Sequence, residues 1–227
     1  RRPRVHHRQA LAFWRNQLTG LPDVLELPTD TVRPAIATGR GARTDFVIPA
    51  DVARRVEEVA RSRRMTPFMV LHAALAVLLA RLSATDDLAI GTPIAGRDRR
   101  ELEPLIGMFV NTLVLRTAVV PEQSFTDLLD RVRQTDLDAF AHGDVPFETV
   151  VDAVGPVRSE AFAPLAQVWL TVDGATSVEL AGTDLDSTTV GELTISPMPT
   201  ESVSAKVDLL VGVSPAPEGD WGGSVIY

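Results

Sequence analysis

Four histidines are the side chains of this 227-residue sequence best suited to move protons near neutral pH. His6 and His7 are adjacent, His72 stands alone in an apolar run, and His142 lies two residues before Asp144. The sequence has no cysteine, which excludes disulfides, thiolate metal sites and a cysteine nucleophile. It also contains no cluster with metal-ligand spacing and no glycine-rich phosphate loop. Acid–base and polar side chains are therefore the candidates for chemistry.

A second group of polar side chains lies in the stretch from Ile90 to Arg116, which reads IGTPIAGRDRRELEPLIGMFVNTLVLR. Two glycine turns and a proline flank one arginine, Arg97, and one asparagine, Asn111. Turns of this kind at a strand end hold polar groups at the edge of a sheet, where binding sites are often built. Arg97 and Asn111 are therefore candidate site residues.

This stretch resembles the condensation domains of nonribosomal peptide synthetases. Members carry GTP-x-AGR followed by L-IG-x-FVNT-x-x-x-R, and residues 91–116 match almost letter for letter. A second segment, His142 to Glu148, reads HGDVPFE and is similar to the family's His-Gln-Asp-x-Pro-Phe-Glu. The resemblance runs from about Phe13 to Tyr227. It implies the C-terminal lobe of a chloramphenicol acetyltransferase-like fold, in which two α/β lobes form a V with a channel between them.

The resemblance implies an acyltransferase of antibiotic biosynthesis and secondary metabolism. Such a domain forms an amide bond between an aminoacyl or peptidyl thioester and an aminoacyl acceptor. Peptidyl carrier proteins upstream and downstream present both substrates on phosphopantetheine arms, and the domain itself binds no cofactor and no metal. Two alternatives stay open: a related acyltransferase that forms esters or uses a soluble acceptor, and a non-catalytic condensation-like domain that docks another enzyme. Epimerization relatives carry GWFT where residues 107–112 read GMFVNT, which favours condensation.

The family's catalytic motif, His-His-x-x-x-Asp-Gly, belongs to the first lobe. His6 and His7 do not complete it, because Leu11 and Ala12 stand where Asp and Gly are required. The sequence also begins with Arg1 rather than Met, as a piece of a longer polypeptide does. We therefore expect that the N-terminal lobe is absent, that no catalytic residue lies in this chain, and that the chain alone is inactive.

The resemblance also implies roles for single residues. Arg97 is the candidate for an ion pair with the aspartate of the missing motif; the alternative is a plain surface arginine. Asn111 is expected to hold the backbone at the loop end rather than to touch substrate. Gln167 lies on a strand similar to a channel-lining strand of the family, which makes it a candidate channel residue. Gly143 and Ala166 stand where Gln and Phe are usual, so we expect looser packing near the channel.

Simpler roles than catalysis are preferred for the histidines. His6 and His7 fit a solvated helix start. His72 fits a hydrogen-bonded packing residue in a buried helix. His142 fits a loop residue beside Asp144 as a helix N-cap, and acid–base chemistry is the alternative for both His72 and His142.

Hydrophobic periodicity predicts the elements that must position these residues. Helices are predicted at 4–18, 51–63, 66–82, 124–141 and 146–154, and strands at 44–48, 88–90, 113–119, 166–172, 188–196, 206–213 and 223–227. A short polar helix is predicted from Arg99. The helix after Thr66 is apolar nearly all round, with Leu78 among its apolar residues, and so is predicted to be buried. Ser124 is predicted to cap the next long helix, with its inward side chains at Leu128, Leu129, Val132, Leu137 and Phe140.

The expected fold class is α/β, an α+β two-layer sandwich whose mixed sheet is covered by helices. Residues 1–227 form one lobe, in which 1–20 supply the first helix and 21–40 an extended surface connector with four prolines. The 45% of apolar residues suffices for a packed core, and the net charge of −8 argues against a nucleic-acid or anionic-membrane partner. Since no run approaches the roughly 18 apolar residues of a membrane span, a cytoplasmic protein is expected.

Overall fold

The computed structural model describes residues 4–97, 100–172, 188–190, 193–195, 203–217 and 219–227. Its helices are α1 Arg4–Leu18, α2 Ala50–Ser62, α3 Pro67–Ser83, the short 3-10 helix η1 Arg100–Leu102, α4 Phe125–Ala141 and α5 Phe147–Val154. Its strands are β1 Arg40–Gly41, β2 Arg43–Ile48, β3 Asp87–Ile94, β4 Asn111–Ala118, β5 Val168–Val172, β6 Thr188–Val190, β7 Leu193–Ile195, β8 Val203–Ser204, β9 Leu209–Ser214 and β10 Trp221–Ile226. The five predicted α-helices are confirmed to within one residue at each end. Of the strand predicted over 188–196, residues 191–192 and 196 lie outside the described residues.

Six strands form one mixed sheet in the order β2-β10-β9-β5-β3-β4. β5 runs parallel to both β3 and β9, and the other neighbours are antiparallel. The longest ladder joins β3 to β4, from Asp87 opposite Ala118 to Ile94 opposite Asn111. β1 with β8 and β6 with β7 form two small antiparallel pairs. The predicted mixed sheet of an α/β chain is confirmed.

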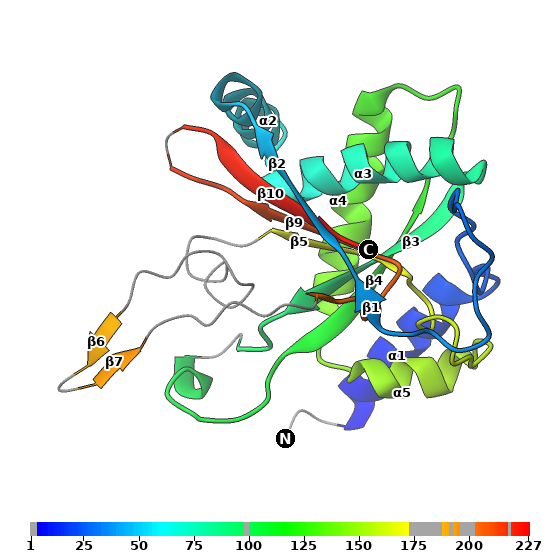
Figure 1. The fold of residues 1–227 in the computed structure, drawn as a ribbon. Coiled ribbons are helices and arrows are strands. Elements are labelled where there is room, and N and C mark those ends of the chain that lie inside the picture. The colour runs from blue at the N-terminus through cyan, green and yellow to red at the C-terminus, as the bar shows by residue number, and fades with distance from the viewer. Residues whose placement is uncertain (1–3, 98–99, 173–187, 191–192, 196–202, 218) are drawn as a thin grey trace.

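Helices cover the β3–β4 edge of this sheet on both faces (Figure 1). Successive side chains of a strand point to opposite faces, so neighbours on β3 enter different clusters. Ile90 packs in a cluster with Leu75 of α3, whereas Ala89 packs in a cluster with Trp14 of α1. α1 and α5 therefore add a layer at this edge, on the face opposite α3.

The α3 helix begins as predicted and is largely a core helix. Thr66 caps it by accepting a hydrogen bond from the Met69 amide, and Pro67 occupies its first position. The predicted burial on all sides is wrong at Leu78, which is 53% exposed because α3 packs on the sheet, α2 and α4 and leaves one face to solvent. No described helix is by itself long and apolar enough to cross a membrane, and only α2 and α3 taken together, across a 109° bend, have the length and composition.

The α4 helix has the predicted cap but a different inward face. Ser124 and Asp127 form a reciprocal capping box, and Leu128, Leu129 and Val132 are buried as predicted. The prediction is wrong at Leu137 and Phe140, which are 42% and 46% exposed. Buried positions of α4 recur at three or four residues, and this spacing continues from Val132 to Asp136 and Ala139. Asp136 is thus turned into the core.

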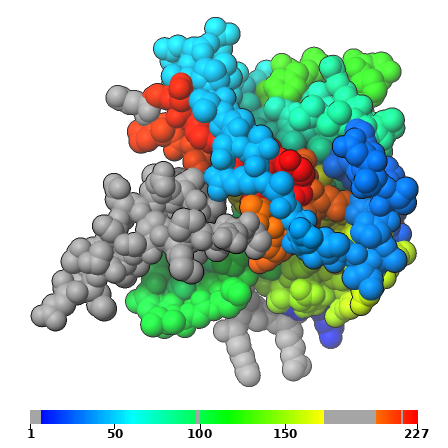
Figure 2. Space-filling view, in the orientation of Figure 1, coloured from blue at the N-terminus to red at the C-terminus, as the bar shows by residue number. Residues whose placement is uncertain are grey.

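The connector between α1 and β1 is extended, as predicted, and Figure 2 shows it in blue along the surface of the molecule. Val32 and Ile36 are exposed. Leu25 is buried, however, and anchors the connector in the cluster that contains Leu75 and Val168. The connector is therefore fixed to the core near its start.

Candidate functional site

The two sequence motifs meet at one cavity. Ile94, the last residue of β3, is paired with Asn111, the first residue of β4, and the described residues 95–97 and 100–110 belong to the loop that connects them. The segment after α4 approaches the same place. The cavity has a volume of about 930 Å³ and is lined by Ile94, Ala95, Gly96, Arg97, Met108, Phe109, Val110, Asn111, Phe140, Ala141, Gly143, Asp144 and Pro146. Arg97 and Asn111, predicted as site residues, are thus brought together.

Asn111 ties one motif to the other. Its side-chain Nδ2 donates to the carbonyl oxygens of Gly143 (3.0 Å) and Val145 (2.7 Å). Its Oδ1 accepts from the backbone amide of Phe147 at 2.9 Å, the first residue of α5. The side chain therefore holds backbone, as expected of it. It also does the capping that was predicted for Asp144: α5 has no cap from its own N-cap residue, Pro146, and that prediction for Asp144 is wrong.

Arg97 stabilises the loop that carries it. Its guanidinium lies over the ring of Phe109, 4.2 Å from the ring centre, and its Nη1 donates to the carbonyl oxygens of Leu102 and Glu103. The preceding Gly96 has φ +63°, and a Cβ there would lie 2.0 Å from the Phe109 carbonyl oxygen. Only glycine fits this contact, so the loop is folded back on itself at Gly96 and Phe109.

The outer part of this loop is apolar and exposed. Leu105, Ile106, Met108 and Val110 are all exposed, and Met108 and Val110 also line the cavity. Isolated apolar side chains on a surface are ordinary, but four within six residues beside a cavity form a contact surface. We call this set the apolar rim.

Arg116, the last residue of the 90–116 stretch, fastens α1 to the sheet. It forms a two-pronged ion pair with Asp87, Nε to Oδ1 at 2.8 Å and Nη2 to Oδ2 at 2.6 Å. The hydrogen bond with Asp87 raises the pKa of the Arg116 guanidinium above its usual value. Its Nη1 donates to the carbonyl oxygens of Gln17 (3.1 Å) and Thr19 (2.8 Å) at the end of α1. Arg116 of the motif thus stabilises the fold by joining α1 to β3.

His142 is held beside the cavity rather than in it. Its Nδ1 donates to the Asp138 carbonyl at 2.7 Å, and its ring stacks on Phe13 at 4.1 Å. Its own carbonyl accepts from Trp14 Nε1 at 3.0 Å. His142 therefore links the end of α4 to α1. His7 is exposed on the first turns of α1, as expected, whereas the side chain of His6 lies outside the described part of the chain.

His72 lies in a buried polar network that the sequence did not reveal in full. Its Nδ1 is 2.9 Å from Oδ1 of Asp136, and its Nε2 is 3.1 Å from Oγ1 of Thr117. All three side chains are buried, and Oδ2 of Asp136 has no hydrogen-bond partner among the described residues. The hydrogen-bonded packing role expected of His72 is present. The missed signal was Asp136, which falls on the same helical face as Val132.

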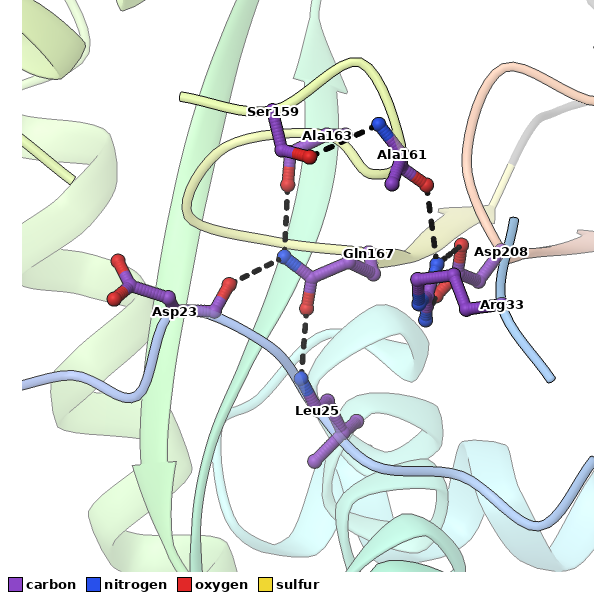
Figure 3. A network of polar contacts seen from close by, with 8 residues as sticks. All are labelled: Asp23, Leu25, Arg33, Ser159, Ala161, Ala163, Gln167 and Asp208. Atoms are coloured by element: carbon purple, nitrogen blue, oxygen red, sulfur yellow. Dashed lines mark hydrogen bonds and ion pairs between the residues drawn. The ribbon is translucent and has the colours of Figure 1, made fainter. Parts of the chain in front are cut away.

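Gln167, a candidate channel residue, is buried and hydrogen-bonded within the chain. Figure 3 shows its amide between the connector and the segment before β5. Nε2 donates to the carbonyl oxygens of Asp23 (2.9 Å) and Ala163 (2.8 Å), and Oε1 accepts from the Leu25 amide at 2.9 Å. The residue is 3% exposed. Because the amide is enclosed and its hydrogen bonds are made within the chain, it holds the connector in place, and its place in a channel wall stays a prediction.

Figure 3 also shows a second set of polar contacts that hold the connector. Arg33 forms a two-pronged ion pair with Asp208, with Nη1 to Oδ1 at 2.8 Å, and also donates to the Ala161 carbonyl (Figure 3).

Among the described residues, no group of three His, Asp or Glu side chains is arranged to hold a metal ion.

Comparison with known proteins gives one consistent result. A family model described as "Condensation domain" matches residues 3–227. A dimodular nonribosomal peptide synthase of Bacillus subtilis (strain 168) is 46% identical over 177 residues, which are 78% of this chain and 7% of that protein. An isonitrile lipopeptide synthase of Mycobacterium tuberculosis is 41% identical over 204 residues, 90% of this chain and 8% of that protein. The chain thus spans under a tenth of either relative.

Solved structures agree with these relatives. A four-domain nonribosomal peptide synthetase, crystallised with AMP and glycine, superposes with a TM-score of 0.87 at 26% identity over 96% of this chain and 17% of that one. The X-domain from teicoplanin biosynthesis superposes with a TM-score of 0.85 at 28% identity over 97% of this chain and 49% of that one. A solved structure of the X-domain in complex with OxyB superposes with a TM-score of 0.85 at 28% identity.

Proposed function

The chain belongs to the condensation domain family, and from that membership we propose that it is the C-terminal lobe of an amide-forming condensation domain in a cytoplasmic nonribosomal peptide synthetase. The length of the match supports the proposal that this chain is one lobe of two, because the chain aligns with only 49% of the X-domain chain. Its substrates are an aminoacyl or peptidyl thioester and an aminoacyl acceptor. Each is attached to the phosphopantetheine arm of a peptidyl carrier protein.

The reaction explains what such a lobe contributes. The acceptor nitrogen attacks the thioester carbonyl, a C–N bond forms, the C–S bond breaks, and the amine gives up a proton. Holding both reactants in line within a closed channel accounts for much of the rate enhancement of such a reaction. The histidine motif that handles the proton in the family is not part of this sequence. We therefore assign this chain to positioning, with the 930 Å³ cavity as its share of the channel wall.

One observation carries the proposal: Asn111 joins the two motif segments around the cavity. Three hydrogen bonds connect it to Gly143, Val145 and Phe147, across 32 to 36 residues of sequence. A site assembled from two separate motifs is what a substrate channel requires. A motif that only filled the core would not need to surround a cavity.

We propose that Arg97 supports the active site by an ion pair with the aspartate of the motif in the other lobe. Its Nη1 is used within the loop, whereas the described part of the chain offers no hydrogen-bond partner to its Nε and Nη2 groups. The stacking on Phe109 fixes the plane of the guanidinium. A fixed plane with free donors suits a carboxylate partner.

The test is a condensation assay with the complete synthetase and both carrier proteins loaded. We expect Asn111→Ala to lose at least tenfold in product formation, because the Gly143 segment loses its attachment. The exposed Asn16, changed to Ala, is the matched control and should keep full activity. Full activity of Asn111→Ala would contradict the assignment of the cavity to the channel. Replacing the acceptor amine by a hydroxyl tests the ester-forming alternative.

A second candidate is a docking domain without condensation activity. It is favoured by the likeness to the X-domain, which has a solved structure in complex with OxyB, and by the exposed apolar rim at Leu105, Ile106, Met108 and Val110. The same assay separates the two functions. Wild-type synthetase that is fully loaded but forms no amide supports docking, and amide formation supports condensation.

A further inference from the structure

Gly143 is a glycine whose conformation does not require glycine. The positive φ angles among the described glycines belong to Gly20, Gly39, Gly96, Gly155 and Gly219. Gly143 has an ordinary backbone, so other residues can adopt it. What distinguishes the position is space, and the effect of a side chain there is a packing effect.

The space beside Gly143 is occupied by the wall of the cavity. A Cβ at Gly143 would lie 2.9 Å from Cδ1 of Ile94 and 3.4 Å from Cδ2 of Leu113. Carbon atoms pack at about 3.5–4.0 Å, so the contact with Ile94 is too short. The looser packing expected from the missing glutamine is therefore wrong, because Ile94 fills the place.

The backbone of Gly143 cannot retreat to relieve this contact. Its amide donates to the Phe140 carbonyl at 3.2 Å, and its carbonyl accepts from Asn111 at 3.0 Å. Ile94 is paired with Asn111 in the β3–β4 ladder, so its backbone is fixed as well. The freedom that remains is the end of the Ile94 side chain, which can rotate about its own bonds.

Ile94 and Gly143 both line the cavity described above. We propose that residue 143 sets, through Ile94, the size of the substrate side chain that the cavity accepts. With glycine, Ile94 lies back against Gly143 and the cavity stays open. A larger residue at 143 pushes Ile94 forward and narrows the cavity. The ligand class is the side chain of a carrier-bound aminoacyl group, so this inference rests on the proposed function.

The experiment uses the complete synthetase with Gly143→Ala and Gly143→Gln. The probes are two series of aminoacyl pantetheine thioesters with alanine, leucine or phenylalanine, one series as acceptors and one as donors. We expect Gly143→Gln to lower the phenylalanine-to-alanine ratio of kcat/KM by at least about tenfold in one series, the discrimination that a small change in an apolar pocket gives. Gly143→Ala should shift the ratio in the same direction by less.

Two further variants separate size from general damage. Ile94→Ala combined with Gly143→Gln should restore the ratio, because the side chain that narrows the cavity is shortened. Gly222 is the matched control: its φ is also ordinary and a Cβ there meets no atom within 4 Å. Gly222→Gln should leave the ratio unchanged. A ratio that does not move in either series, or no rescue by Ile94→Ala, overturns the proposal.

A structural readout keeps this inference apart from the proposed function. Crystal structures of Gly143→Ala and Gly143→Gln should show Ile94 in a different rotamer and a smaller cavity. If the wild-type enzyme forms no amide with any probe, the proposed condensation activity is wrong. The position of Ile94 in the variant structures still tests whether residue 143 sets the size of the cavity. An unmoved Ile94 overturns the inference even where condensation is confirmed.

Discussion

Nδ1 of His72 lies 2.9 Å from Oδ1 of Asp136, and both side chains are buried between α3 and α4. Removing one partner leaves the other buried and unsatisfied, which costs about 1–3 kcal/mol or more. We predict that Asp136→Leu and His72→Leu each lower the free energy of unfolding by at least this amount.

The double variant should lose less than the sum of the two single losses, because neither member of the pair is left buried without the other, and Thr117 loses its His72 partner in the single His72→Leu variant as well. Urea unfolding of all four proteins measures the cycle, with the exposed Asp130→Leu as control. Additive losses would mean that the pair contributes no coupling.

Leu75 is buried in α3, where it contacts the sheet. We predict that Leu75→Ala lowers the free energy of unfolding by about 2–5 kcal/mol, as large-to-small core changes do. Leu78→Ala on the same helix is the control and should cost under about 0.5 kcal/mol, because Leu78 is half exposed. A loss below about 1 kcal/mol for Leu75→Ala would place α3 at the periphery.

Arg97→Ala is predicted to lose most condensation activity in the complete synthetase or to give insoluble protein. It removes the contact with Phe109 and the hydrogen bonds to Leu102 and Glu103. Arg97→Lys should not restore activity, because an ammonium cannot stack flat on the Phe109 ring and offers no planar pair of donors to a carboxylate. Product yield and soluble yield are measured together, and a soluble Arg97→Ala protein with unchanged product formation contradicts the role.

The α4 cap predicts a dependence of stability on pH. The hydrogen bond from Ser124 to the Asp127 carboxylate lowers the pKa of Asp127 below its usual 3.8. A lowered folded-state pKa contributes stability above the unfolded value, and the contribution disappears as the pH falls through the folded value. Wild type should therefore be more stable than Asp127→Asn at pH 7, and the difference should shrink as the pH falls from 3.8 through the lowered folded-state pKa. Urea unfolding over this pH range decides; a constant difference excludes the linkage.

The chain by itself is predicted to form no amide product. Positioning requires groups on both sides of a channel, and the His-His-x-x-x-Asp-Gly motif is not in this sequence. A carrier-protein assay is run with the chain alone and then with the separately produced N-terminal lobe of its parent. Product from the chain alone would mean that the catalytic residues lie within residues 1–227. Product that forms only after the N-terminal lobe is added supports a site that needs both lobes.

Local signals in the sequence were enough for the helices and for the two motif segments that line the cavity. Thr66-Pro67 and Ser124 mark helix starts by chemistry within four residues of the cap, and both are confirmed. The two motifs could be recognised from their residue types and spacing. The structure adds that both motifs line the same cavity.

The features that the sequence did not predict have a common physical cause, because each depends on which distant segments pack against the residue. Asp136 faces the core because His72 is there, 64 residues earlier. Gln167 is enclosed because its amide hydrogen-bonds to backbone atoms of residues 23 and 25. A backbone partner can belong to any residue type, so the sequence does not reveal it. Leu78 is exposed because none of the described elements packs over that face of α3, which hydrophobic periodicity does not predict.

The order of strands in the sheet has a consequence for the newly made chain. In the described part of the chain, β2 pairs only with β10, so residues 43–48 wait for residues 221–226 before they are hydrogen-bonded. On a translating ribosome, β2 emerges with an unpaired edge and remains so while roughly 170 residues are added. Early termination before β10 therefore leaves β2 without its partner and with its backbone edge open to other chains.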